Sequence, residues 1–574
     1  DQCIAKRVRG AIVVSEPEPG TDLRALIAHA RRNGLRIIGP ASMGVASPLP
    51  GVALQASIVN AATAPGSVAV SMQSGILGAS LLRLAAQLEL GLSWFVSLGD
   101  KLDVSANDLL QFWEDDEATR VICLYTESVG NGRKFSRIAR RVAAHRPIVL
   151  VRTGAAQVGA GNTAMYRQSG VIEVPTVTAL LDTARVLTFC PTMPGDRVAV
   201  VGNSRSPRVL AEATLRAGGL EPVACPVELG WRSTADDYRQ ALTAALADPG
   251  VDAVLVVYAP PTEHFLRAPH EAVDAAARGG DKPVVAVMLG TGDGPLVPGS
   301  PVPSFAFPEQ AAAALGRVGF YSRWLRQEAA EAADADSADD TTVDTDAAET
   351  MLARIPDGPV DPARAGELLA TYGITATPTR RVRAAEAVAA ADLIGYPVAV
   401  KAVRRGVGRS AEAGIALDLT DADDVAAAVA TMARHDGVDA TEVFVQAMLP
   451  PGIDVRVHAV DDPALGPVIN VGLGGFQADL IGDVASRIAP LTPSAARSML
   501  ADTRAAAALG AADRDAVVDL LVRAGRLADD HPEIAELDLN PVIVADGTAQ
   551  VADVTLVVQA GVRPERPFRR LESD

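Results

Sequence analysis

Short, continuous apolar runs alternate with stretches of helical periodicity through the first 326 residues. Strand-like runs occupy residues 68–71, 121–125 and 148–151, and segment 76–88 repeats its apolar positions every three or four residues. Strands buried on both faces of a parallel sheet have such uninterrupted apolar runs, and the helices between them cover those faces. The pattern therefore predicts an α/β fold built from strand–helix units.

This alternation falls into three blocks, at 1–62, 63–192 and 193–326. The first block contains a helical pattern at 23–33 and a short strand at 35–38. The other two blocks repeat the order of strand, turn and helix several times. Each block is therefore expected to form a separate α/β domain or a part of one.

An acidic stretch at 327–350 separates these blocks from the last part of the chain. Residues 328–349 carry nine Asp or Glu and no Lys or Arg, which is half of the formal net charge of −18. Such a run favours a solvated linker. The final block, at 351–564, opens with a helix that Asp361 is expected to cap.

Asn540 and Asp553 flank a predicted hairpin near the carboxyl end. Between them lies Asp546-Gly547, a dipeptide typical of two-residue turns, with apolar residues on both sides. Pairing of the two strands would bring an amide oxygen beside a carboxylate, and hard oxygen ligands of this kind suit Mg²⁺. An ordinary Asn-Pro turn and a strand-end aspartate are the alternative.

Three further features predict phosphate binding. Lys401 ends an apolar run at 398–401, where its ammonium group would reach nucleotide phosphates as a point charge. Gly472-Leu473-Gly474-Gly475 follows another strand, and its backbone has few Cβ atoms to keep a phosphate away. Gln73-Ser74-Gly75 begins a helix whose free N–H groups would bind an anion. A solvated lysine and an ordinary turn before a helix are the alternatives.

Composition narrows the class of protein. The 574-residue chain has no uncharged apolar run long enough for a membrane-spanning helix and no basic patch that suggests nucleic-acid binding. Its four cysteines are too widely spaced for a disulfide framework, which fits a reducing cytoplasm. The chain lacks an initiator methionine and an apolar leader, so we expect further sequence upstream of residue 1.

The order of these features resembles the NDP-forming acyl-CoA synthetases, relatives of succinyl-CoA synthetase. The motifs at 472–475 and 536–541 carry the resemblance in the final block, and those at 97–100 and 125–128 carry it in the second. The resemblance implies part of a Rossmann-like CoA-binding domain, then two flavodoxin-like domains, then an ATP-grasp domain. It implies ATP or ADP, Mg²⁺ and CoA or acyl-CoA as ligands, and it allows an oligomer.

The resemblance also assigns roles to residues that match the family's motifs. Arg409 stands at a position where the family has lysine. The alternative for Gln446 and Asp454 is that they are ordinary polar residues of edge strands without a binding role. The implied ATP-binding residues are Lys401, Arg409, Gln446, Asp454, Gly472, Gly474, Gly475 and Arg487. The implied CoA- or phosphate-binding residues are Gly39, Pro40, Gln73, Ser74 and Gly75, and the implied metal ligands are Asn540 and Asp553.

One central residue of the family is missing. These enzymes pass phosphate through a histidine in the loop after the strand predicted at 148–151, but this chain has no histidine between residues 146 and 263. The side chains of Asn162 and Thr163 cannot form the same phosphoramidate. Glu127, which orients that histidine in the family, is left as a vestigial catalytic residue or a solvated carboxylate. Arg205-Ser206 replaces two glycines of the phosphate site, and Ala41 replaces an asparagine.

Three functions are consistent with this sequence. One is an active acid–CoA ligase, and another is a scaffold without chemistry. We favour a third, a ligase-like module that binds nucleotide and CoA compounds and regulates a GNAT-type protein lysine acetyltransferase. No acetyltransferase domain is recognisable in the 574 residues, so that partner domain is expected upstream.

Overall fold

The computed structural model describes residues 1–59, 63–153, 160–227, 229–262, 267, 269–334, 343–404, 414–435, 438–463, 465–475 and 481–559. The chain divides into two compact units. The first unit is Asp1–Gly159 with Tyr166–Ala333, and the second is Ala160–Met165 with Asp334–Asp574. Among the described helices, none has the length and apolar character needed to cross a bilayer.

The first block forms a small parallel pair of strands. The strands β1 (Gly10–Ile12) and β2 (Arg36–Ile38) are joined through α2 (Leu23–Arg32), and the four-residue α1 (Gln2–Ala5) precedes them. The Asp22 side chain caps α2 by accepting a hydrogen bond from the N–H of Ala25. The helix and strand predicted in this block are therefore confirmed.

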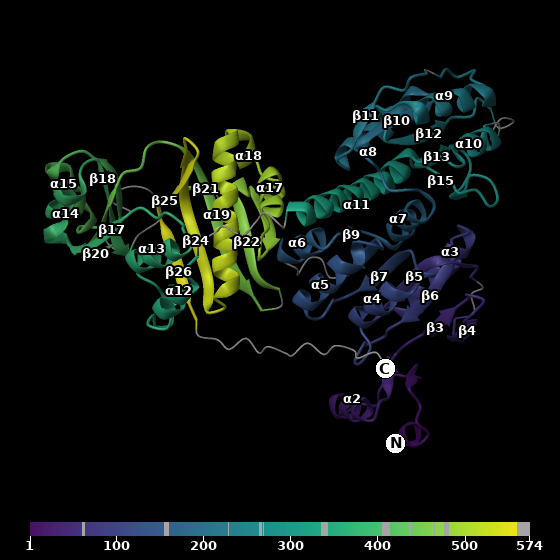
Figure 1. Ribbon diagram of the computed structural model, residues 1–574, viewed down its shortest axis with the longest axis horizontal. Coiled ribbons are helices and arrows are strands. Elements are labelled where there is room, and N and C mark those ends of the chain that lie inside the picture. Colours follow the sequence, from purple (N-terminus) through teal and green to yellow (C-terminus); the bar gives the residue numbers. More distant parts are fainter. Residues whose placement is uncertain are drawn as a thin grey trace. The chain divides into compact units, whose positions relative to one another are not determined.

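Seven strands form the next sheet (Figure 1). Five of them are parallel, as the continuous apolar runs predict, and their carboxyl ends therefore meet at one edge. The other two strands, at 44–47 and 54–57, come from the block at 1–62. They pair antiparallel with each other, and the strand at 44–47 also pairs antiparallel with β6 (Leu92–Ser97). In spatial order the strands are β4 (Leu54–Ser57), β3 (Gly44–Ser47), β6 (Leu92–Ser97), β5 (Pro65–Met72), β7 (Val121–Thr126), β8 (Ile148–Arg152) and β9 (Val171–Val174).

Helices follow the strands of this sheet. The carboxyl ends of the parallel strands lead into helices α3 and α5, so the amino termini of these helices lie at the same edge as the strand ends. The helices in chain order are α3 (Gly75–Gln87), α4 (Ala106–Asp115), α5 (Gly132–Ala143), α6 (Ala160–Gln168) and α7 (Val177–Phe189).

A second, six-stranded sheet completes the first unit. Its two central strands are fully buried, and helices cover both faces. The strands in spatial order are β11 (Glu221–Val223), β10 (Arg197–Gly202), β12 (Ala253–Tyr258), β13 (Val284–Met288), β15 (Pro303–Phe305) and β14 (Gly294–Pro295). The helices are α8 (Arg205–Ala217), α9 (Ala235–Ala247), α10 (His270–Ala277) and α11 (Pro308–Asp334).

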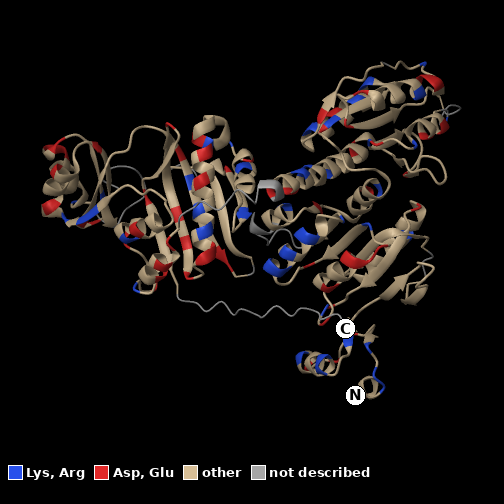
Figure 2. Ribbon diagram, viewed as in Figure 1, with Lys and Arg blue, Asp and Glu red and all other residues tan. Residues whose placement is uncertain are grey.

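The predicted acidic linker is partly helical. Helix α11 continues to Asp334, and Glu328 and Glu331 both pair with Arg140 of the cation-rich α5, at 2.7 and 2.9 Å (Figure 2). The first acidic residues of 327–350 are therefore packed against a basic helix, because tertiary structure supplies the opposite charge. Residues 335–342 lie outside the described part.

The second unit contains two antiparallel sheets. The smaller sheet has β17 (Thr379–Arg383), β20 (Asp439–Ala447), β18 (Val398–Arg404) and β19 (Ile415–Leu419), with α14 (Ala387–Ile394) and α15 (Ala422–Met432) packed on it. The larger has β16 (Gly358–Pro359), β26 (Val554–Val558), β24 (Ile534–Ala545), β21 (Ile453–Asp462), β22 (Gly466–Leu473) and β23 (Val484–Ile488), with β25 (Thr548–Val551) beside β24.

One face of this larger sheet is covered by helices (Figure 1). Leu521 and Leu527 of α19 (Ala511–Asp530) share one apolar core with Leu537 and Leu539 of β24. The opposite face carries polar residues, as described below. The helices are α12 (Thr345–Leu352), α13 (Pro362–Thr371), α17 (Pro493–Ala501), α18 (Ala505–Ala508) and α19 (Ala511–Asp530), and Asp361 caps α13 as predicted.

Candidate functional site

Lys401 and Gln446 line a cavity of about 500 Å³ in the second unit. Lys401 lies opposite Phe444 in the β18–β20 pairing, and Gln446 is two residues further along β20. Because side chains alternate between the faces of a strand, all three point to the same face of the smaller sheet. Asp553, in the connection between β25 and β26, lines the same cavity.

These polar groups converge on one short segment. The Lys401 ammonium donates to the carbonyl oxygen of Ala552 at 3.0 Å, and the Gln446 Nε2 donates to the same oxygen at 2.9 Å. Lys401 Nζ also lies 3.6 Å from the Asp553 carboxylate, and its side chain is only 12% exposed. A cation and an anion are thus held together at the wall of the cavity.

Asn540 and Asp553 come together as the sequence predicts. Strands β24 and β25 pair as a hairpin, and Asp546 and Gly547 at its turn have φ angles of 50° and 73°, which a two-residue turn requires. The N–H of Asn540 donates to the carbonyl oxygen of Asp553 at 3.1 Å. An amide oxygen and a carboxylate are oxygen donors of the kind that suits Mg²⁺, but of these two residues only Asp553 lines the 500 Å³ cavity.

The glycines at 472–475 are required by the chain's own packing. A Cβ atom at Gly472 would clash with the backbone of Asp483, and one at Gly474 would clash with the backbone of Val455. Gly475 has a φ of 83° and donates its N–H to the side-chain oxygen of Asn540 at 2.8 Å. The loop therefore positions Asn540, one of the two candidate metal ligands.

Of the predicted nucleotide-binding residues that the structure describes, only Lys401 and Gln446 line the cavity; Gly472, Gly474, Gly475, Asp454 and Arg487 do not. The buried Arg487 side chain pairs with Asp502 at 2.8 Å and donates to the carbonyl oxygen of Ser486. Asp454 does not line the cavity either, and its carbonyl oxygen accepts the N–H of Gly474 at 2.8 Å. Arg409 lies outside the described residues.

A charged stripe on the larger sheet was not predicted from the sequence. Glu536, Asp538 and Asn540 alternate along β24, so they share one face. Asp538 accepts two hydrogen bonds of 2.9 Å from Arg456, and Glu536 lies 3.0 Å from His458. The polar–apolar alternation of residues 536–540 was the available signal, but the partners on β21 depend on strand register.

In the first unit, Gln73 and Glu127 meet at the carboxyl edge of the seven-stranded sheet. The Gln73 side chain accepts hydrogen bonds from the Glu127 N–H at 2.9 Å and from the Thr126 hydroxyl at 3.1 Å, and its Nε2 donates to the Glu127 carboxylate at 3.3 Å. Ser74 occupies the N-cap of α3 without a side-chain cap. The first N–H groups of α3, including that of Gly75, are thus left for another partner.

Lys101 belongs to the same cluster, which sequence reasoning missed. Its ammonium donates to the carbonyl oxygen of Ser128 and to the Thr126 hydroxyl at 3.4 Å. Burial lowers the pKa of Lys101, and the neighbouring Glu127 carboxylate partly offsets that effect. A lysine, a glutamate and a helix amino terminus at one edge can bind a phosphate or a thioester carbonyl.

Gly39 and Pro40 lie beside the loop that carries Lys101. Their carbonyl oxygens accept the N–H groups of Leu102 at 3.4 Å and Asp100 at 3.0 Å, respectively. Gly39 has a φ of 105°, and a Cβ atom there would clash with the carbonyl oxygen of Val13. The predicted CoA-binding residues of the first two blocks are therefore close together in space.

His145 does not replace the missing histidine at this edge. His145 precedes β8, so it lies at the amino edge of the sheet, whereas Glu127 follows β7 at the carboxyl edge. A five-residue strand separates the two edges by about 17 Å. The loop at 154–159 and His264 lie outside the described residues. Helix α8 begins at Arg205, so Arg205 and Ser206, which stand where the family has two glycines, form its first turn.

Comparisons with known proteins match both parts of the chain in which these clusters lie. Residues 65–187 match the succinyl-CoA ligase-like flavodoxin domain, and residues 356–558 match an ATP-grasp domain. The chain is 30% identical to the acetate–CoA ligase [ADP-forming] I of Archaeoglobus fulgidus, over 97% of this chain and 88% of that protein. It is 23% identical to the 4-hydroxybutyrate–CoA ligase [ADP-forming] of Nitrosopumilus maritimus, over 95% of this chain and 86% of that protein.

A solved structure shows the same fold. It is the dinucleotide-forming acetyl-coenzyme A synthetase 1 of Ca. Korarchaeum cryptofilum in complex with phosphate and ADP. The match covers 56% of this chain and 80% of that one, at 25% identity and a TM-score of 0.51. The predicted combination of flavodoxin-like and ATP-grasp domains is confirmed.

Proposed function

Because this chain belongs to the family of ADP-forming acyl-CoA synthetases, we propose that it binds a nucleotide and a CoA compound without passing phosphate through a histidine. The nucleotide would occupy the 500 Å³ cavity of the second unit. The CoA compound would occupy the carboxyl edge of the first unit.

The nucleotide site rests on Lys401, Asn540 and Asp553. Lys401 would exchange its contact with Asp553 for nucleotide phosphates, since its ammonium has three donors. Asn540 and Asp553 would then hold Mg²⁺, which neutralises phosphate charge when bound. The solved relative with ADP and phosphate supports a nucleotide diphosphate as the ligand class.

The CoA site rests on the cluster around Gln73. The free N–H groups of α3 and the Lys101 ammonium supply positive charge for an anionic or carbonyl oxygen. Gln73 orients Glu127 through two hydrogen bonds, and Gly39-Pro40 brings the first block alongside. The names of the relatives support an acyl-CoA as the ligand class.

The observation that carries the loss of the relay is the absence of histidine between residues 146 and 263. Glu127 is hydrogen-bonded to Gln73, and His145 lies at the opposite edge of the sheet. A phosphate relay needs a nucleophilic imidazole close to the phosphate, at the same edge of the sheet as Glu127.

We expect no phosphoenzyme from this chain. Incubation with ATP labelled at the γ-phosphate should leave no acid-labile, base-stable label on the purified protein, and acetate with CoA should release no ADP. The Lys401→Ala chain serves as the background control. Stoichiometric acid-labile label above that background would show an active ligase, which is the alternative function.

A regulatory role extends this proposal. The chain resembles the degenerate ligase modules fused to GNAT-type acetyltransferases, and we propose that it regulates lysine acetylation in the cytoplasm. Coupling between such sites is typically about 1–3 kcal/mol, or roughly 5- to 150-fold in affinity. We expect acetyl-CoA or ATP to change the acetylation rate of a protein that contains this module, compared with one truncated before α13. Equal rates at every ligand concentration would leave a scaffold.

A further inference from the structure

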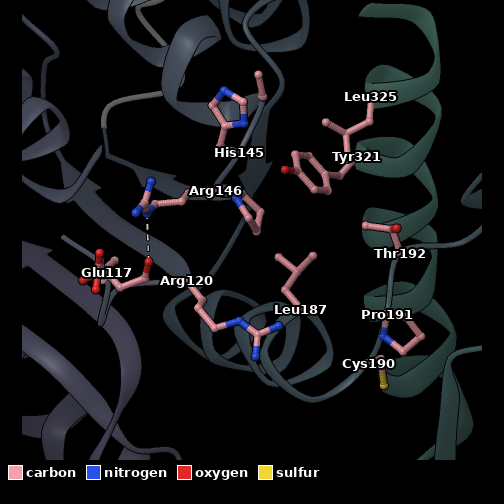
Figure 3. A pocket seen from close by; sticks show the side chains of 13 residues that line it. Glu117, Arg120, His145, Arg146, Leu187, Cys190, Pro191, Thr192, Tyr321 and Leu325 are labelled. Carbon is pink, nitrogen blue, oxygen red and sulfur yellow. Dashed lines mark hydrogen bonds between the residues drawn. The ribbon is translucent and has the colours of Figure 1, made fainter. Parts of the chain in front are cut away.

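A second cavity, of about 440 Å³, opens at the amino edge of the seven-stranded sheet (Figure 3). The turns before β7 and β8 form one wall, with Arg120 and His145, and the end of α7 forms another, with Leu187. The connection at Cys190–Thr192 and helix α11, with Tyr321 and Leu325, close the other side. This cavity lies at the edge opposite Gln73, Glu127 and Lys101.

Some of its polar side chains are fixed by the fold. Arg146 donates to the carbonyl oxygens of Thr119 at 2.8 Å and Asp116 at 3.0 Å, and the Tyr321 hydroxyl donates to that of Ala143 at 2.7 Å. These bonds hold the ring of Tyr321 and the stem of Arg146 in place. They provide a preformed wall.

Other polar side chains in the cavity have no partner. Within the described part of the chain, neither the Arg120 guanidinium nor the His145 ring makes a hydrogen bond or an ion pair. Glu117 is the one carboxylate among the described residues that line the cavity, against the two arginines Arg120 and Arg146. The cavity therefore carries net positive charge beside the apolar side chains of Leu187 and Leu325.

We propose that this cavity binds a small amphipathic anion. Its carboxylate or phosphate head would pair with the Arg120 guanidinium, whose forked donors match either group. Its short apolar body would contact Leu187, Tyr321 and Leu325. The volume lies near the lower end of the range for small-molecule sites, about 300–1,000 Å³, so the ligand is small.

The position of the cavity makes this ligand an effector. Helix α11 packs in the core of the six-stranded sheet. It also bonds to two helices that follow strands of the seven-stranded sheet: the Tyr321 hydroxyl donates to α5, and the Trp324 indole N–H donates to the carbonyl oxygen of Gln168 in α6 at 3.1 Å. A ligand in contact with α7, the connection after it and α11 would touch elements of both halves of the first unit. It would stabilise one arrangement of the two sheets.

The test is calorimetric titration of the full chain with hexanoate, hexyl phosphate, hexan-1-ol and hexylammonium. We expect hexanoate, hexyl phosphate or both to bind, and the alcohol and the amine to fail. Removing the charged partner in Arg120→Gln should weaken binding about tenfold or more. The variant Thr192→Trp, at an exposed position, should fill the cavity and abolish binding without changing its charge. Arg434→Gln, an exposed arginine of the second unit, is the matched control.

Four results would overturn this proposal. The first three are failure of both anions at millimolar concentration, equal binding of hexan-1-ol, and binding that survives Arg120→Gln and Thr192→Trp. Loss of binding in Gln73→Ala would also overturn it, because it would place the anion at the carboxyl edge. The proposed nucleotide site is independent, so its failure in Lys401→Ala would leave these titrations unchanged.

Discussion

The melting temperature of the intact chain should rise when Mg²⁺ and ATP or ADP are added together, and the Lys401→Ala chain should show no rise. A ligand that binds only the folded state stabilises it by about 2.7 kcal/mol at a hundredfold excess over Kd. Lys401 is the cation in the cavity wall, 12% exposed and 3.6 Å from Asp553. Its removal leaves the phosphates beside an unbalanced carboxylate, so binding should be lost rather than reduced. Differential scanning fluorimetry measures the effect.

Two variants show whether the shift belongs to this site. Asp553→Asn keeps the shape of a metal ligand but removes its charge, so the shift should shrink and require more Mg²⁺. Lys134→Ala, a lysine of the first unit, should keep the full shift. A shift of equal size in Lys401→Ala and in the unaltered chain would contradict a nucleotide in this cavity.

Replacing Arg185 by methionine should destabilise the first unit by about 3–5 kcal/mol, the usual cost of breaking a buried ion pair. The Arg185 side chain is 1% exposed and donates to the carbonyl oxygens of Gly294 and Ser304. Its guanidinium lies 4.7 Å from the Phe305 ring and 3.9 Å from Asp182. The substitution leaves two carbonyl oxygens without a donor and a buried carboxylate without its cation. Urea unfolding measures the loss, and the exposed Arg216→Met should change stability by less than about 0.5 kcal/mol.

The pH dependence of the folding stability distinguishes the contribution of the Asp182 carboxylate from that of side-chain packing. Burial raises the pKa of Asp182 to about 6, with Arg185 acting in the opposite direction and Asp293 in the same one. The folded chain thus holds a proton that the unfolded chain has already released, and stability falls as pH rises from about 4 to about 6. Asp182→Asn should therefore lack this fall, so its stability relative to that of the unaltered chain should increase between pH 4 and pH 6, in addition to any constant change from the altered contact with Arg185. A difference in stability that does not change with pH would contradict the raised pKa of Asp182.

Strand position and local turns followed from the sequence because they depend on neighbours in the chain. The apolar runs at 121–125 and 148–151 became β7 and β8, and Asp546-Gly547 formed the turn that brings Asn540 to Asp553. The presence of a flavodoxin-like domain and of an ATP-grasp domain after it was likewise readable from the order of the motifs. The sequence also showed the missing histidine, since an absent residue type needs no coordinates.

Partners across the sheets could not be assigned in this way. Lys401 was expected to be ready for phosphate, but it contacts Asp553, and Arg487 pairs with Asp502 away from the cavity. Periodicity fixes the face on which a side chain lies, but register and strand order decide what it meets. The same holds for Glu328 and Glu331, which pair with Arg140. Composition alone does not distinguish an acidic solvated linker from an acidic helix packed against a basic one.

The sequence by itself determined the α/β elements, the order of a flavodoxin-like and an ATP-grasp domain, the hairpin between Asn540 and Asp553 and the absence of histidine between residues 146 and 263. Only the tertiary structure decided that Lys101 joins Gln73 and Glu127, that Arg456 holds Asp538, and that a basic cavity lies beside Arg120. The first set depends on local periodicity and residue identity. The second arises where segments distant in the chain are packed together, because the energy of each contact depends on a partner that local sequence does not name.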